Sequence, residues 1–476
     1  MAETRKHGYE GISDLPKGFE MTELGSIPEE WEIKRLEEAV AEIMSGDWGK
    51  GENASGLVAC LVLRGTDFAD AEKCNLSKVP IRYVKLSTVQ KRHLKAGDLL
   101  VELSGGSKDQ PTGRILLISD ELLKKSKLPI LYSNFTKRIR LTSDYVPEYY
   151  AFFWRHLYNL GATRIYEKRT TGIRNFKLND FLRNESIPLP PLSEQRAIAH
   201  VLRTVQRAKE ATERVIQTTR ELKKSLMRYL FTYGPVPIEE AERVPLKETE
   251  IGLVPEHWEV VRLGDFVRRG VLALRNGFTQ GRHNESGKGI PHLRPFNIDG
   301  DGNLTMHHVK YVPPPPPDSP YWLQIGDVVF NNTNSEELVG KTAYFGQDVH
   351  CVLSNHMTLI RVMDASIIDS YWLSRILHFL YQCGIFRLLC RRHVNQVSVS
   401  LERLQSLYLP FPPLPEQHKI ARILQAVDKK LQAEEARKQA LEELFKTLLH
   451  NLMTGEIRVK DVVLPNVGEG KGDVTH

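Results

Sequence analysis

Residues 188–202 read PLPPLSEQRAIAHVL, and residues 410–424 read PFPPLPEQHKIARIL. A proline pair ends any upstream helix, and the apolar residues after it recur at the three- and four-residue intervals of one helix face. Each copy therefore predicts the start of a helix. The spacing between the copies is far longer than that of a solenoid repeat, so it indicates two copies of a whole module.

The second helix continues as a heptad pattern, in which apolar residues alternate at steps of four and three. The interhelix positions of the second copy are Ile420, Leu424, Val427, Leu431, Leu441, Phe445, Leu448 and Leu452. The first copy keeps this phase at its ends, at Ile198, Leu202, Val205, Leu226 and Leu230. Each helix has about 38 residues, or roughly 57 Å at 1.5 Å per residue.

Such helices are unstable alone in water, so we expect the two to pair with each other. Antiparallel pairing is favoured, because parallel pairing would place both modules at the same end of the helix pair.

A second repeat opens each module. Residues 24–36 read LGSIPEEWEIKRL and residues 251–263 read IGLVPEHWEVVRL. Together the two repeats predict a leader, a globular domain, a central helix, a linker, a second globular domain, a distal helix and a tail. The corresponding ranges are 1–20, 21–190, 191–233, 234–250, 251–412, 413–455 and 456–476.

Both globular domains mix strands and helices. In the first, strand-like runs at 57–63, 98–103, 115–119 and 137–141 precede a helical segment at 147–161. In the second, Gly326-Asp327 answers to Gly97-Asp98, Ser354-Asn355 answers to Ser133-Asn134, and a helix is expected at about 368–383. The predicted fold class is α+β: two similar α/β domains joined by two long antiparallel coiled-coil helices, with pseudo-two-fold symmetry.

Composition places few limits on function. The chain has 476 residues, a net charge of +6 and five cysteines without a CxxC pair. This pattern argues against a disulfide framework or a cysteine-rich zinc site and fits a reducing cytoplasm. The amino terminus has no apolar signal core, and no run of about 18 apolar residues predicts a membrane span.

Motifs for catalysis are weak. Gly340-Lys341-Thr342 resembles a phosphate-binding loop, but Ser335 stands where that motif needs glycine. The histidines show no HxxxH or HExxH spacing. The carboxylates of Glu29 and Glu32 lie too close in sequence to come from two strands of a nuclease site. No glycine-rich methyltransferase loop is present, so we expect no catalytic, metal or cofactor site on this chain.

Basic residues mixed with amides recur in both globular domains. Arginine and lysine neutralise phosphates, arginine reads guanine, and asparagine or glutamine reads adenine. The candidate DNA-binding residues of the first domain are Lys137, Arg138, Arg164, Lys168, Arg169, Thr171 and Arg174. Those of the second domain are Arg275, Arg282, His283, Arg294, Asn332, Asn334, Lys341, Arg391, Arg392, His393, Asn395 and Gln396. In this comparison Arg174 stands where the second domain has Gln396.

The doubled signature, an opening P-E-x-W-E-x-x-R-L or a close variant and a closing L-P-P-L-x-E-Q or P-P-L-P-E-Q before a long helix, resembles the specificity subunit of type I restriction–modification enzymes. The resemblance covers nearly the whole chain. It implies two target recognition domains, each reading one half of a split double-stranded DNA site, with the paired helices as a spacer.

The resemblance also implies partners. Two modification subunits would carry S-adenosylmethionine and methylate adenine at N6, and restriction subunits would use ATP and magnesium. It implies that Glu194, Gln195, Glu416 and Gln417 lie near subunit contacts. This chain itself would be non-catalytic and cytoplasmic.

Two alternatives belong to other classes. A self-sufficient nuclease or methyltransferase would need cryptic motifs and would act on DNA with magnesium or S-adenosylmethionine alone. A coiled-coil adaptor without a DNA role would show no salt-dependent DNA affinity.

Overall fold

A computed structural model describes residues 15, 17–106, 110–170, 173–250 and 252–459. The chain divides into two compact units. Unit 1 is made of Met1–Glu213 with Arg437–His476, and unit 2 is made of Arg214–Ala436. Each unit therefore contains one globular head and one end of each long helix.

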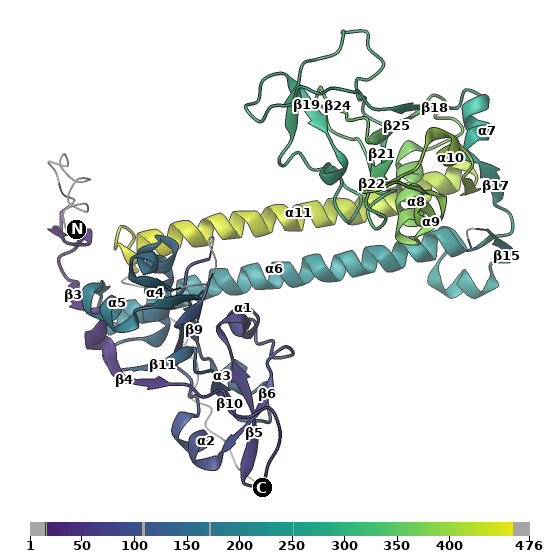
Figure 1. The fold of residues 1–476 in the computed structure, drawn as a ribbon. Helices are drawn as coiled ribbons and strands as arrows, with labels where there is room; N and C mark the ends of the chain where they lie inside the picture. The colour runs from purple at the N-terminus through teal and green to yellow at the C-terminus, as the bar shows by residue number, and fades with distance from the viewer. Residues whose placement is uncertain (1–14, 16, 107–109, 171–172, 251, 460–476) are drawn as a thin grey trace, which may run out of the picture. The chain divides into compact units, whose positions relative to one another are not determined.

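The long helices are α6 (Leu192–Tyr233) and α11 (Leu414–Met453), which follow the two proline pairs as predicted (Figure 1). Beyond them, Gly234 and Gly455 have φ of 79° and 74°. Residues other than glycine rarely adopt this left-handed conformation, so each glycine marks where the chain leaves its helix.

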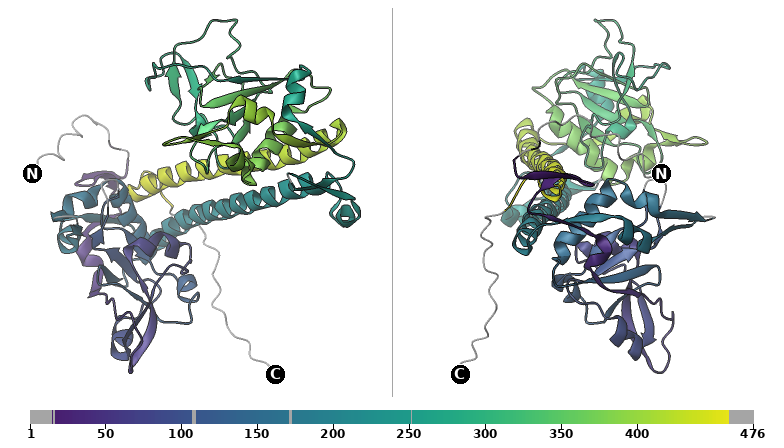
Figure 2. Two further views of the ribbon diagram at one scale, coloured as in Figure 1. Left: turned by 45° about the vertical axis from the view of Figure 1, so that its right-hand side comes forward. Right: turned by 90° about the vertical axis from the view of Figure 1, so that its left-hand side faces the viewer.

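The two helices pair antiparallel in each unit. In unit 1, Ile198 and Leu202 near the start of α6 share a core with Leu452 near the end of α11. In unit 2, Leu230 near the end of α6 shares a core with Leu424 near the start of α11. Figures 1 and 2 show the helices side by side. The residues of the predicted seam are buried or half-buried in both units, as close packing between helices requires.

The head of unit 1 is built from short sheets and covering helices. Its first part contains β1 (Phe19–Thr22), β2 (Gly25–Pro28), β3 (Glu32–Arg35), β4 (Val40–Ser45), β5 (Leu57–Leu63), α1 (Phe68–Glu72), β6 (Ile81–Lys85) and α2 (Leu86–Arg92). Its middle contains β7 (Leu99–Glu102), β8 (Ser104–Gly105), β9 (Ile115–Leu117), α3 (Asp120–Leu123), β10 (Ile130–Tyr132) and β11 (Thr136–Leu141). It closes with α4 (Pro147–Asn159), β12 (Glu167–Thr170), β13 (Ile173–Phe176), α5 (Leu178–Asn184) and β14 (Ser186–Leu189).

The head of unit 2 follows the same plan. Its first part contains β15 (Leu246–Thr249), β16 (Gly252–Pro255), β17 (Glu259–Arg262), α7 (Leu263–Arg268), β18 (Leu272–Asn276), β19 (Ile290–Leu293) and β20 (Lys310–Val312). Its second part contains β21 (Val328–Asn331), β22 (Thr333–Asn334), β23 (Thr342–Tyr344), β24 (Val352–Leu353) and β25 (Met357–Val362). It closes with α8 (Ser370–Gln382), α9 (Ile385–Leu389), β26 (Arg391–Arg392), β27 (Val397–Ser398), α10 (Leu401–Gln405) and β28 (Tyr408–Phe411).

Strand order matches between the heads. The four-stranded antiparallel sheet β4-β11-β7-β9 of unit 1 corresponds to β18-β25-β21-β23 of unit 2. The short sheet β12-β13-β8 corresponds to β26-β27-β22, and the pair β14-β3 corresponds to β28-β17. The expectation of two similar α/β heads joined to paired long helices is thereby confirmed, and the four strand-like runs of the first head are all strands.

Candidate nucleic-acid interface

The glutamate of each EQ pair accepts a hydrogen bond from the tryptophan that opens its module. Trp31 Nε1 donates to Glu194 Oε2 over 3.1 Å in unit 1, and Trp258 Nε1 donates to Glu416 Oε2 over 2.9 Å in unit 2. The two sequence repeats therefore recur together because they form one contact between the start of a head and the start of its long helix.

Glu194 also binds Arg458, whose Nε lies 2.8 Å from Glu194 Oε1. Burial alone would raise the pKa of Glu194, but the hydrogen bonds from Arg458 and Trp31 outweigh it and lower this pKa. The carboxylate is thus held ionised inside unit 1.

The glutamine of each EQ pair fixes the helix that covers the head's sheet. Gln195 Oε1 accepts from the Val146 N–H at the start of α4, and Gln417 Oε1 accepts from the Asp369 N–H at the start of α8, each over 2.9 Å. Each Nε2 donates back to a proline carbonyl just before its own long helix, that of Pro190 or Pro412. These bonds tie three segments of each unit together.

This geometry gives the EQ residues a role within the chain, and their expected position near subunit contacts stays a prediction. Glu194, Gln195 and Gln417 are buried, and Glu416 is half-buried, so their polar atoms serve contacts within the chain. Each buried polar group thus has a hydrogen-bond partner, as stable packing between head and helix requires.

Each head presents one loop-bearing edge of its four-stranded sheet, which we call the loop edge. In unit 1, Ser45 pairs with Lys137 and Glu102 pairs with Thr136, so the end of β4, the end of β7 and the start of β11 meet there. In unit 2, Asn276 pairs with Thr358 and Asn331 pairs with Met357. Among the predicted DNA-binding residues, Lys137 lies at the start of β11, Arg282 and His283 lie in the loop after β18, and Asn332 and Asn334 follow β21.

The hairpin before each long helix joins the same edge. In unit 1, Arg174 on β13 lies opposite Gly105 on β8. In unit 2, Val397 on β27 lies opposite Asn334 on β22. Gly105 follows Gly97 by the same number of residues as Asn334 follows Gly326, so these two positions are equivalent. Arg174 therefore corresponds to Val397. The expected match of Arg174 with Gln396 is therefore wrong by one residue, because the segment from Arg174 to Gln195 is one residue longer than the segment from Val397 to Gln417.

Several predicted residues of unit 1 lie near the surface at or beside the loop edge. Arg164 and Lys168 are exposed, whereas Lys137 and Arg174 are half-buried. Arg174 Nη1 lies 3.4 Å from Glu167 Oε2. Arg138 is fully buried and pairs with Glu42 at 2.7 Å, so we leave it out of the proposed DNA-binding set. Thr171 lies outside the described residues, and of Arg169 only its place in β12 is described.

In unit 2 the exposed predicted residues gather on the hairpin and on the loop after β18. They are Arg282, His283, Arg391, Arg392, His393, Asn395 and Gln396.

Three half-buried residues also keep part of their surface open. Arg275 lies over the Tyr321 ring, Arg294 lies over the Phe296 ring, and Asn334 is on β22.

Two residues of unit 2 are buried and leave the set. Asn332 Nδ2 donates to Thr358 Oγ1 over 3.0 Å, and Lys341 Nζ donates to the Ile298 carbonyl over 2.7 Å. Their side-chain nitrogens stabilise the loop edge through hydrogen bonds inside the head. Because the Lys341 ammonium is buried and bound to a backbone carbonyl, the Gly-Lys-Thr sequence has a structural role in this head.

Residue-by-residue reasoning missed a pair of turns at the loop edge. Asn134 and Phe135 in unit 1, and Asn355 and His356 in unit 2, are all exposed. The repeated Ser-Asn dipeptide was a signal for these turns, but it did not show which side chains would reach the surface.

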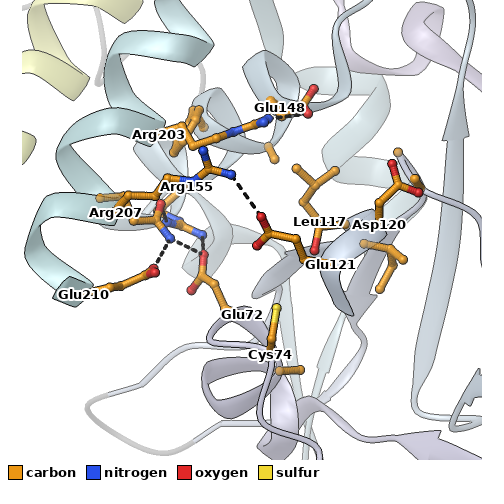
Figure 3. A pocket seen from close by; sticks show the side chains of 18 residues that line it. Glu72, Cys74, Leu117, Asp120, Glu121, Glu148, Arg155, Arg203, Arg207 and Glu210 are labelled. Atoms are coloured by element: carbon orange, nitrogen blue, oxygen red, sulfur yellow. Dashed lines mark hydrogen bonds and ion pairs between the residues drawn. The ribbon is translucent and has the colours of Figure 1, made fainter. Parts of the chain in front are cut away.

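A cavity of about 340 Å³ in unit 1 has another role (Figure 3). It is lined by segments near α1, α3, α4 and α6. Arg155 pairs with Glu72, Arg203 pairs with Glu148, and Arg207 pairs with Glu121. Each of these three arginines is paired with a carboxylate, so the cavity is not an open anion site. The ion pairs of Arg203 and Arg207 instead hold α6 against the head.

Neither metal nor membrane signals were found in the part of the chain that the structure describes. No group of three or more histidine, cysteine, aspartate or glutamate side chains there is arranged to hold a metal ion. None of its helices is long and apolar enough to cross a membrane.

Known proteins resemble the chain over nearly its whole length. A family model described as the type I restriction modification DNA specificity domain matches twice, over residues 28–221 and 255–443. Two curated relatives come from Methanocaldococcus jannaschii. The type I restriction enzyme MjaX specificity subunit is 26% identical over 460 residues, which are 93% of this chain and 97% of the relative. The type I restriction enzyme MjaVIII specificity subunit is 27% identical over 304 residues, 62% of this chain and 67% of the relative.

A solved structure shares the fold. The S subunit of a type I restriction–modification system from M. genitalium has a TM-score of 0.58 at 14% identity, covering 92% of this chain and 98% of that one.

Proposed function

Because the chain belongs to the family of type I restriction–modification DNA specificity subunits, we propose that each of its heads reads one half of a split, asymmetric DNA site through its loop edge. The observation that supports this most is the contrast between the two heads. They share strand order and the tryptophan–glutamate and glutamine contacts, yet their exposed edge residues differ. A shared frame with different surface chemistry suits two unlike half-sites.

DNA recognition is this chain's role, and catalysis in such systems lies on other subunits. We infer that two modification subunits bind the chain, carry S-adenosylmethionine and methylate adenine at N6 in the cytoplasm. Restriction subunits using ATP and magnesium would complete the assembly. The methylated adenine lies inside the duplex, so the complex must extrude it from the base stack before reaction.

The exposed basic residues supply phosphate contacts, which fix register and make binding depend on salt. Amide and guanidinium side chains supply base contacts, each worth about 1–3 kcal/mol of discrimination. On the unit 2 hairpin, Gln396 is exposed and free to reach a base edge, and His393 Nε2 lies 2.8 Å from Ser398 Oγ.

The test uses the full chain assembled with its cognate modification subunit. Methylation is measured on DNA in which each base pair of the site is varied in turn. Gln396→Ala is expected to relax base preference in one half-site by about 5- to 150-fold, the range of one bidentate contact. Equal relaxation in both half-sites would contradict the assignment of one head to one half. Exposed Gln432→Ala on α11 is the matched control.

A further inference from the structure

The turns that precede β11 and β25 are held by the same set of backbone bonds. In unit 1, Ser133 N–H donates to the Leu63 carbonyl, and the Ser133 carbonyl accepts from Thr136 N–H. In unit 2, Ser354 N–H donates to the Leu293 carbonyl, and the Ser354 carbonyl accepts from Met357 N–H. These four bonds span 2.8–3.0 Å, so the two turns have one backbone frame.

Neighbouring strands fix this frame from both sides. The Phe135 carbonyl accepts from Leu103 N–H over 2.8 Å, and the His356 carbonyl accepts from Asn332 N–H over 3.1 Å. On the other side a glycine packs against each turn. A Cβ added to Gly46 or Gly277 would lie 2.2 Å from the carbonyl oxygen of Ser133 or Ser354, so no side chain fits there. Both turns are therefore rigid at the backbone.

The side chains on this rigid frame point into open space. Phe135 is 56% exposed, and Asn134, Asn355 and His356 are exposed as well. Within the described part of the chain, none of the three polar side chains among them makes a hydrogen bond to the protein. Fixed backbones that carry uncommitted side chains are preorganised for a ligand, because little conformational freedom remains to be lost on binding.

The two turns share one exposed residue type and differ in the other. Asn134 and Asn355 are equivalent and identical, and an asparagine amide matches the N6 and N7 atoms of adenine. The next residue is Phe135 in unit 1 and His356 in unit 2. An aromatic ring makes apolar contact with the thymine methyl group, whereas an imidazole N–H donates to a purine N7.

We propose that these two turns are matched base-reading positions, one in each head, and that Phe135 and His356 make the two half-sites differ. The shared asparagine reads adenine in both. Phe135 selects thymine through its methyl group, and His356 selects a purine through N7. This proposal rests on the proposed function, since it assumes that the loop edge meets DNA.

The experiment compares Phe135→Ala, Phe135→Leu and His356→Ala in the full chain assembled with its modification subunit. Methylation rates are measured on DNA varied one base pair at a time. Phe135→Ala is expected to reduce preference about tenfold at one base pair of one half-site, and Phe135→Leu is expected to retain most of it. His356→Ala is expected to act only on the other half-site. Exposed Met21→Ala, in the β1–β2 hairpin, controls for loss of an apolar surface residue.

The outcomes separate the two claims. If the wild-type assembly methylates a split site but all base preferences survive Phe135→Ala and His356→Ala, the turns do not read bases, although the heads still do. If the wild-type assembly binds and methylates DNA without any site preference, the proposed function fails, and this proposal fails with it. Matched thermal unfolding of the variants and wild type shows that any change arises at the DNA surface.

Discussion

At the residue scale, the EQ pair decides how a head meets its helix. Gln195 and Gln417 each satisfy one backbone N–H and at least one carbonyl that would otherwise lie unpaired near the core. An unsatisfied buried polar group costs about 1–3 kcal/mol, so one glutamine offsets the desolvation of several groups. The tryptophan–glutamate contact beside it adds a second fixed point.

Replacing Gln417 tests this role. Gln417→Ala leaves the Asp369 N–H and the Pro412 and Ile367 carbonyls without their partner. We expect a loss of about 2–4 kcal/mol of stability, measured by denaturant unfolding of the full chain. The exposed Gln432→Ala on the same helix is expected to change stability little. A Gln417→Ala variant as stable as wild type would show that these bonds do not hold α8.

At the scale of elements, the two units differ in how the helix that covers the sheet, α4 or α8, contacts the long helices. In unit 1, Phe152 of α4 packs against Phe445 of α11, with ring centroids 6.1 Å apart. In unit 2, Arg375 occupies the position equivalent to Phe152 and lies 3.6 Å from Asp428 of α11. Lys223 of α6 pairs with the same carboxylate at 2.6 Å. Packing in one unit is thus replaced by a buried ionic cluster in the other.

Removing the central carboxylate should be costly. Asp428→Ala leaves Lys223 and Arg375 buried as two unmatched cations, and breaking such a pair costs about 3–5 kcal/mol. Burial and then Arg375 already lower the pKa of Lys223, which shows how poorly this ammonium is solvated. Thermal unfolding compared with the exposed Lys429→Ala variant provides the measurement. Unchanged stability of Asp428→Ala would mean that the cluster is solvated in solution.

A buried histidine predicts how unit 1 responds to acid. Burial, and then His450 of α11, lower the pKa of His156 in α4 from 6.5 to about 4. A histidine whose pKa is lowered by folding supports stability above its unfolded pKa, and that support is lost as pH falls from about 6.5 towards 4. We expect His156→Phe to flatten the loss of thermal stability over this window. Parallel curves for the variant and wild type would contradict the assignment.

Sequence patterns predicted the elements more completely than the site. Proline pairs and heptads set the long helices, and β5 begins and ends as predicted, because local rules govern these features. Burial is not local. Arg138, Asn332 and Lys341 have the right chemistry for DNA but lie inside the heads. From its residue type alone, Phe135 would be predicted to lie in the core, but the turn that carries it places it at the surface.

At the scale of the whole molecule, repetition explains how one chain can serve a split site. Two heads with one strand order offer equivalent frames, and their diverged loop edges can read unlike half-sites. Because identical contacts join each head to the start of its own long helix, changes on one loop edge should leave the other head unaffected.

The most direct test is a map of N6-methyladenine in host DNA, by single-molecule sequencing, with this gene intact, deleted, or carrying exposed-edge substitutions in one head. The account predicts a split motif with two unlike halves that loses methylation on deletion. Substituting Asn395 and Gln396 together should then change the bases required in one half while the other half and the gap stay the same. Methylation that does not depend on the gene, or a substitution that alters both halves equally, would contradict the account.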